Sequence, residues 1–146
     1  MSKVQEAVVC FNESFSCSQA VFSTYATQFG LDKETAFRVS ASFGGGMARM
    51  GDTCGAVTGA FMVIGLKYGK TRAEDEDSKE RTFQVVQEFV SRFRECNGSI
   101  ICRDLLGCDI STKDGAKKAK EHNLFNTICP NLVKNSAQLL EEILNL

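Results

Sequence analysis

The sequence predicts an all-α fold: a compact single-domain bundle of about five to seven helices around a central apolar helix rich in glycine and alanine. Three observations support this prediction. Apolar residues recur at helical spacing along nearly the whole chain, and no segment alternates as a strand would. The 146 residues include one proline, so long helices can run unbroken. The length fits one domain spanning residues 1–146.

The first third of the chain predicts three helices. Residues 2–11 form a short amphipathic segment. Ser16 followed by Gln19 fits a capping box, which predicts a second helix that ends at Gly30. A third helix starts at Asp32 or Lys33.

A glycine-rich loop over residues 43–51 precedes the central helix, expected at 54–68 with Asp52 or Thr53 as its cap. Gly51, Gly55 and Gly59 recur every four residues. Such a small face lets another backbone approach closely, either within one subunit or from a second copy in a homodimer.

The longest helix is expected at 72–96, with acidic residues 74–77 in its first turns, where the helix dipole favours negative charge. Its predicted buried stripe consists of Phe83, Val86, Phe89, Val90 and Phe93. A short helix at 102–106 ends at a glycine, and a surface helix covers 112–122. The last helix runs from residues 129–130 to 144, because proline suits a first helical position.

Charge and cysteine content narrow the functional classes. Lys and Arg number 17 against 18 Asp and Glu, so no basic excess indicates nucleic-acid binding. The longest apolar stretch, residues 54–66, is shorter than the about 20 residues that span a bilayer, so we expect no membrane insertion. The chain opens without a secretory leader, so we expect a cytoplasmic protein. There, 7 cysteines indicate metal or redox chemistry rather than structural disulfides.

Four cysteines fall at predicted helix N-termini: Cys17, Cys54, Cys102 and Cys129. A helix N-terminus stabilises a thiolate and can lower the pKa of a cysteine from about 8.5 into the range of about 3.5–7.5. If the four converge, they can form a four-thiolate metal or iron–sulfur site, two disulfides or a dithiol relay. Cysteine is also a common buried small hydrophobe, the role we expect for Cys10, Cys96 and Cys108.

The spacing of the cysteines separates these alternatives. The chain has no C-x-x-C, which argues against a zinc ribbon, a thioredoxin-like pair and a haem-attachment site. Long separations favour several ligands that converge on one centre. We therefore expect an iron–sulfur cluster or other thiolate-bound metal, with electron transfer to a redox partner protein. A metal-free thiol–disulfide protein is the alternative, and a structural or interaction protein is the third.

Four segments carry a family resemblance: residues 15–21 (FSCSQAV), 44–46 through 54–59 (GGG to CGAVTG), 102–107 (CRDLLG) and 129–133 (CPNLV). In this order they resemble the redox-active proteins named for their C_GCAxxG_C_C pattern. Thr53 stands where that pattern has glycine. The family's four cysteines map onto Cys17, Cys54, Cys102 and Cys129. The resemblance implies a redox role with an iron–sulfur or other metal centre, beside oxidoreductase or transporter partners.

The glycines near Cys54 are candidate backbone support for this centre. Gly45, Gly46 and Gly55 allow positive φ and close approach, and their N–H groups can donate hydrogen bonds to cluster sulfurs. Arg49 can add positive charge near the thiolates. The loop is one residue from a P-loop, but Asp52 replaces the lysine, which argues against nucleotide binding.

Overall fold

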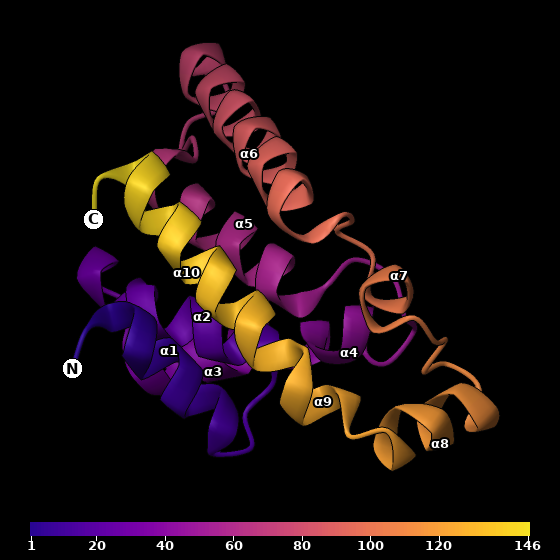
Figure 1. The fold of residues 1–146 in the computed structure, drawn as a ribbon. Coiled ribbons are helices and arrows are strands. Elements are labelled where there is room, and N and C mark those ends of the chain that lie inside the picture. The colour runs from indigo at the N-terminus through magenta and orange to yellow at the C-terminus, as the bar shows by residue number, and fades with distance from the viewer.

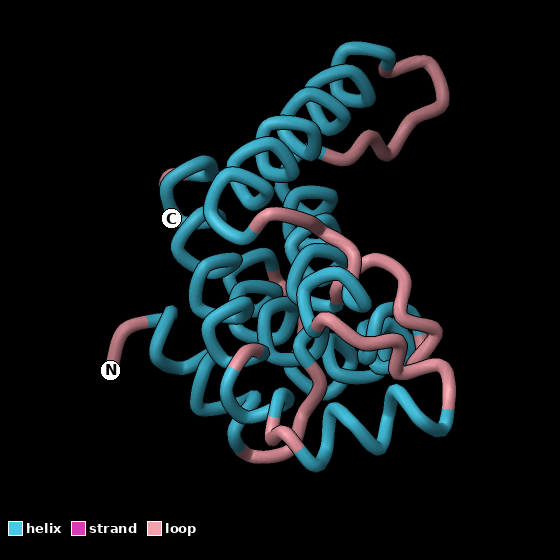
Figure 2. The backbone as a smooth tube through the Cα atoms, turned by 45° about the vertical axis from the view of Figure 1, so that its right-hand side comes forward, coloured by secondary structure: helices cyan, strands magenta, loops and turns pink.

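The computed structural model describes residues 1–146 and contains helices and loops without a β-sheet (Figure 1, Figure 2). Seven helices have eight residues or more: α1 (Lys3–Asn12), α2 (Cys17–Ala26), α3 (Lys33–Ser40), α5 (Gly55–Tyr68), α6 (Glu76–Asn97), α8 (Lys113–Glu121) and α10 (Cys129–Leu144). Three are shorter: α4 (Gly44–Met47), α7 (Cys102–Leu106) and α9 (Leu124–Thr127). The all-α prediction is confirmed. None of the helices combines the length and apolar character that a membrane crossing requires.

Polar caps start the early helices where the sequence places them. Ser16 accepts a hydrogen bond from the N–H of Gln19, whose side chain accepts one from the N–H of Ser16 in return. This is the predicted capping box. Asp32 caps α3 by accepting a hydrogen bond from the N–H of Thr35 at 3.0 Å. These bonds satisfy N–H groups that have no partner inside the helix, so local sequence fixes both helix starts.

The central helix of the bundle is α5, which packs against α2, α6 and α10 (Figure 1). A Cβ atom on Gly55 would lie 2.9 Å from the backbone N of Ser18, and one on Gly59 would lie 2.9 Å from its backbone O. Only glycine therefore lets α2 approach this closely. On another side, the Ser136 hydroxyl donates a hydrogen bond to the Ala56 carbonyl at 2.7 Å. The predicted small-residue face is confirmed at Gly55 and Gly59, and its neighbour is α2 of the same chain. Gly51 lies outside it, in the loop before α5.

The start of α5 differs from the prediction. Neither Asp52 nor Thr53 caps the helix; Cys54 is its N-cap and Gly55 its first residue. Thr53 instead forms an isolated antiparallel bridge with Ile101. This pairing across the chain keeps the backbone extended up to Cys54.

The longest helix, α6, begins at Glu76 rather than at residue 72, with Asp75 as its N-cap. The predicted buried stripe is correct at Phe89 and Phe93, which are fully buried, and wrong at Phe83, which is 52% exposed. The reason is visible in Figure 1, where the N-terminal half of α6 extends beyond the other helices. Phe83 belongs to that half and points away from the core.

Candidate functional site

The four cysteines chosen from the sequence all begin helices, as predicted. Cys17, Cys102 and Cys129 are the first residues of α2, α7 and α10, and Cys54 is the N-cap of α5. Free N–H groups at a helix N-terminus favour negative charge on a nearby sulfur. A side-chain cap accounts for this placement at Cys17, and Pro130 favours the start of α10 after Cys129, whereas the N-caps of α5 and α7 make no side-chain hydrogen bond.

The same four cysteines line a single cavity of about 800 Å³. Their residues are 4–9% exposed, so the sulfurs lie at the edge of the core rather than on the surface. Most of the wall is apolar, with contributions from Phe11, Ala41, Leu105, Leu106, Ile110, Ala116, Phe125 and Leu132. The fold therefore brings together residues from four distant parts of the chain, and we refer to this space as the four-cysteine cavity.

A short backbone clip joins the segments that carry Cys54 and Cys102. The N–H of Cys54 donates to the Ile100 carbonyl at 2.8 Å, and the N–H of Cys102 donates to the Asp52 carbonyl at 2.6 Å. These two bonds flank the Thr53–Ile101 bridge. The separation of α5 and α7 is thus held by main-chain hydrogen bonds, to which the Arg103–Asp52 ion pair adds a side-chain link.

The three predicted support glycines lie against this arrangement. A Cβ atom on Gly46 would lie 2.6 Å from the Cys102 Cβ, and one on Gly55 would lie 3.3 Å from the Cys17 Cβ. Gly45 and Gly46 both have positive φ. Each position therefore needs glycine, for contact with a cysteine at 46 and 55 and for backbone conformation at 45.

A left-handed turn between Gly44 and Gly51 forms part of the wall of the four-cysteine cavity. Five consecutive residues have φ between 53° and 70°: Gly45, Gly46, Met47, Ala48 and Arg49. A left-handed conformation costs a non-glycine residue about 1–2 kcal/mol. Hydrogen bonds from Gly51 N–H to the Gly45 carbonyl and from Asp52 N–H to the Gly46 carbonyl hold the turn in place. Strain of this kind persists where the surrounding structure imposes it, often at functional sites.

The thiols of Cys17 and Cys129 lie close enough to shift each other's titration. Their mutual interaction raises the pKa of Cys17 well above its usual range and lowers the pKa of Cys129. Burial adds to the rise at Cys17 and opposes the fall at Cys129. Cys129 is therefore the first of the four thiols to ionise when no metal is bound.

Burial dominates at the other two cysteines. It raises the pKa of Cys54 to about 11, although the nearby backbone N–H groups of Ala56 and Val57 act to lower it. Burial, followed by the nearby sulfurs of Cys54 and Cys129, raises the pKa of Cys102 to about 12. The expectation that a helix N-terminus lowers each cysteine pKa is thus wrong for Cys17, Cys54 and Cys102, because desolvation and neighbouring sulfurs outweigh the N–H groups.

The four thiols do not surround a single ion. No three His, Cys, Asp or Glu side chains lie close enough together to hold one metal ion. A tetrathiolate zinc would require all four sulfurs within about 2.3 Å of one point. An iron–sulfur cluster binds its thiolates at separate irons and carries sulfide between them, so it suits thiols spread around a cavity. The lining also contains no carboxylate or imidazole. The candidate donors are therefore soft thiolates, the ligands that such clusters prefer.

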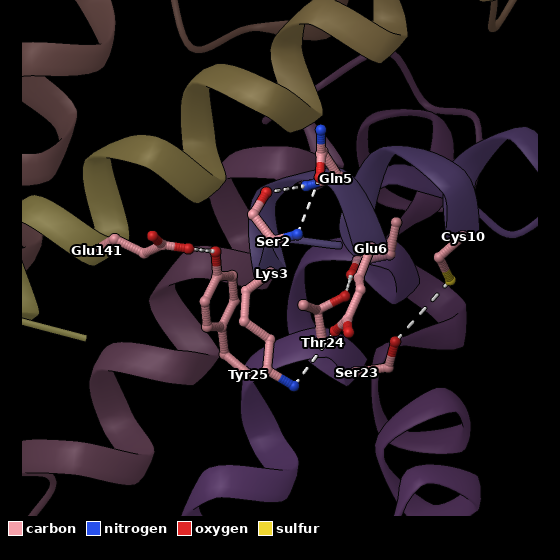
Figure 3. Close-up of polar contacts among 10 residues, drawn as sticks. Ser2, Lys3, Gln5, Glu6, Cys10, Ser23, Thr24, Tyr25 and Glu141 are labelled. Carbon is pink, nitrogen blue, oxygen red and sulfur yellow. Dashed lines mark hydrogen bonds and ion pairs between the residues drawn. The ribbon is translucent and has the colours of Figure 1, made fainter.

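The remaining three cysteines lie outside the cavity. Cys10 is buried between α1 and α2, and its sulfur lies 4.0 Å from the Ser23 hydroxyl (Figure 3). Cys96 is exposed, which corrects the expectation that it fills the core, and Cys108 is half-buried against the core. Cys10 alone fully matches the predicted role of a small buried residue.

Two cationic side chains and several apolar ones complete the cavity. Arg49, considered from the sequence, lines it, whereas Lys120 and Phe125 were not predicted. Lys120 lies on a helix whose lysines indicate only a polar surface, so the sequence contains no signal for its position. His122, the single histidine, ends α8 and is exposed.

Comparison with known proteins identifies the family. The family model described as "Putative redox-active protein (C_GCAxxG_C_C)" matches residues 15–143. Searches of curated proteins and of solved structures find no match. The matched region contains all four cavity cysteines and the support glycines, and it covers well over half of the chain. The chain therefore belongs to the family of putative redox-active proteins defined by the C_GCAxxG_C_C motif.

Proposed function

We propose that the protein is an electron-transfer protein that binds an iron–sulfur cluster through Cys17, Cys54, Cys102 and Cys129. One observation carries the proposal: buried cysteines from four distant segments, each at a helix N-terminus, line one cavity. A packing role would not require four small residues to share both a cavity and a position in their helices. A bound cluster supplies one-electron redox chemistry.

The residues of the chain would serve this centre in three ways. The N-termini of α2, α5, α7 and α10 direct positive dipole ends toward the thiolates. The backbone N–H groups of Ala56 and Val57 lie near the Cys54 sulfur and favour its thiolate. Burial of the four cysteines restricts water, and both hydrogen bonding and solvent exposure set the potential of such a centre.

Binding of the centre must displace protons. Cys54 and Cys102 hold their protons up to pKa values of about 11 and 12, so at neutral pH both thiols must lose a proton to become ligands. Loading should therefore release protons and depend on pH. We place the protein in the cytoplasm, where thiols stay reduced, and expect a redox partner protein to exchange the electron.

A metal-free dithiol is the second candidate, favoured by the close approach of the Cys17 and Cys129 thiols and the lowered pKa of Cys129. The Cys129 thiolate would attack a disulfide sulfur of a partner, form a mixed disulfide and release one partner thiolate. Cys17 would give its proton to that thiolate and then attack the Cys129 sulfur, which releases the second partner sulfur. Two protein thiols become one disulfide, and the partner disulfide becomes two thiols.

Metal and sulfide analysis of protein purified without air separates the two candidates. The proposal predicts iron and sulfide with visible absorbance, lost in Cys54→Ser and retained in Cys10→Ser, since Cys10 is buried outside the cavity. Absence of iron from all three proteins would overturn the cluster. Reversible loss of two thiols on mild oxidation, abolished by Cys17→Ser and unaffected by Cys54→Ser, would then establish the dithiol.

A further inference from the structure

The four-cysteine cavity has a one-sided charge. Two cations, Arg49 and Lys120, contribute to its lining, and no carboxylate does. Both side chains belong to exposed residues, and neither takes part in any of the ion pairs of the chain. By contrast, Arg103 nearby pairs with Asp52 at 3.3 Å. The two cations at the cavity are therefore free to bind an external anion.

The Arg49 side chain is seated at the cavity rather than free in solution. A Cβ atom on Gly45 would lie 3.0 Å from the Arg49 Cγ and 3.5 Å from the Ile110 Cδ1. The stem of Arg49 thus lies over Gly45, beside an apolar residue of the cavity wall. Arg49 keeps a φ of 65° in this position, a conformation that glycine would adopt more easily.

The rest of the cavity suits an apolar body. Phe11 from α1 and Phe125 from α9 provide aromatic surface, and Leu105 and Ile110 add aliphatic surface. The volume of about 800 Å³ lies within the range of about 300–1,000 Å³ typical of small-molecule sites. A cluster core spans only a few bond lengths, so space remains beside the thiols.

We propose that this cavity binds a small organic anion, with its charged group at Arg49 and Lys120 and its apolar body against Phe11 and Phe125. An apolar cavity with a few convergent polar groups is the usual form of a small-molecule site. The bound anion would lie next to the four thiols. This site goes beyond the proposed electron transfer, and anion binding there does not depend on whether the cysteines hold a cluster or form a disulfide.

The test uses two fluorescent probes that share their rings and differ in charge. The anion 8-anilinonaphthalene-1-sulfonate should bind at one site per chain and should slow alkylation of Cys129. The neutral N-phenyl-1-naphthylamine reports on the apolar wall alone. The double variant Arg49→Gln/Lys120→Gln should weaken the affinity for the anionic probe by about ten-fold or more and leave the affinity for the neutral probe unchanged.

The matched control is Arg94→Gln/Lys113→Gln, which removes the same charge from two exposed residues that do not line the cavity. It should bind both probes as the parent does. Equal weakening in the two double variants would overturn the site, because only net charge would then matter. Unchanged affinity for the anionic probe in the cavity variant would also overturn it. Lys120→Gln alone, on the surface of α8, gives a second variant if the double variant is unstable.

Iron content keeps this test separate from that of the proposed function. A cavity variant that loses the anionic probe and keeps the iron and sulfide of the parent supports an anion site. A cavity variant that loses iron together with the probe overturns it, since the two cations would then serve the cluster. If no form of the protein contains iron, the cluster fails and the probe experiment still decides the anion site.

Discussion

The thiols of Cys17 and Cys129 lie close together and shift each other's pKa in opposite directions, so the N-termini of α2 and α10 meet at this pair of sulfurs. The other two cavity cysteines are related differently, since main-chain hydrogen bonds clip the segments of Cys54 and Cys102 together. The centre is thus built from two pairs. One pair is joined by its sulfurs and the other by its backbone, which gives the four thiols unequal chemistry.

The first consequence is an order of reactivity. In metal-free reduced protein at pH 7–8, iodoacetamide should modify Cys129 before Cys17, Cys54 and Cys102, because only the pKa of Cys129 is lowered. Peptide mapping by mass spectrometry measures the rates, with exposed Cys96 as the accessible reference. The Cys17→Ala substitution should slow the modification of Cys129 by iodoacetamide, whereas Cys10→Ala should not. Modification of Cys54 first would contradict this assignment.

The second consequence concerns stability at alkaline pH. Cys17, Cys54 and Cys102 have raised pKa values in the folded protein, so their contribution is fully present below the unfolded value of about 8.5 and is lost as pH rises through about 11 and 12. Cys129, with a lowered pKa, works in the opposite direction. The urea midpoint of the reduced, metal-free protein should therefore fall between pH 8 and pH 10.5. The urea midpoint of a Cys54→Ser variant should fall less over the same pH interval. An equal fall would show that ionisation of Cys54 does not contribute to the loss of stability.

Glycines on α5 offer a matched pair of substitutions. Gly59→Ala places a Cβ atom 2.9 Å from the Ser18 backbone O, whereas Gly65→Ala in the same helix meets nothing within 4 Å. Gly59→Ala should lower the free energy of unfolding by about 1–3 kcal/mol, and Gly65→Ala should raise it by about 0.5–1 kcal/mol. Chemical denaturation measures both. Similar effects at the two positions would show that α2 does not require the close approach.

The left-handed turn predicts the reverse behaviour at neighbouring positions. Ala48 has φ 53° and ψ 47° and is exposed, so Ala48→Gly should stabilise the protein by about 1 kcal/mol. Gly46→Ala places a Cβ atom 2.6 Å from the Cys102 Cβ and 2.7 Å from the Asp52 N, and it should destabilise by about 1–3 kcal/mol. Melting temperatures measure both changes. A lower melting temperature for Ala48→Gly would rule out strain at this residue.

The helix starts could be predicted because their signals are local. Ser16 with Gln19, Asp32, and the Cys129–Pro130 step each fix a boundary through residues within one turn. Two of these signals placed Cys17 and Cys129 at helix N-termini; Cys54 and Cys102 also begin helices, but without a side-chain cap. The family motif selects these four as well.

Non-local contacts account for what the sequence could not predict. The late start of α5 depends on Thr53 pairing with Ile101, far along the chain. The left-handed backbone at Met47, Ala48 and Arg49 is imposed by hydrogen bonds that close the loop, and no residue preference indicates it. Sequence spacing also carries no information on which two sulfurs touch. Exposure of Phe83 follows from how far α6 runs past the other helices, which helical periodicity does not determine.

The Thr53–Ile101 bridge has a consequence for how the chain can vary in length. Helices α5 and α6 lie in the chain between Thr53 and Ile101, the two residues that form the bridge. The two helices therefore form an excursion, a loop of chain whose two ends are held side by side. The exposed turn at residues 69–74 joins the two helices at the far end of that excursion (Figure 2). A peptide tag or a whole domain inserted in this turn would lengthen the excursion without moving Cys54 away from Cys102. A second domain can therefore be inserted at this turn without changing the arrangement of the four cavity cysteines.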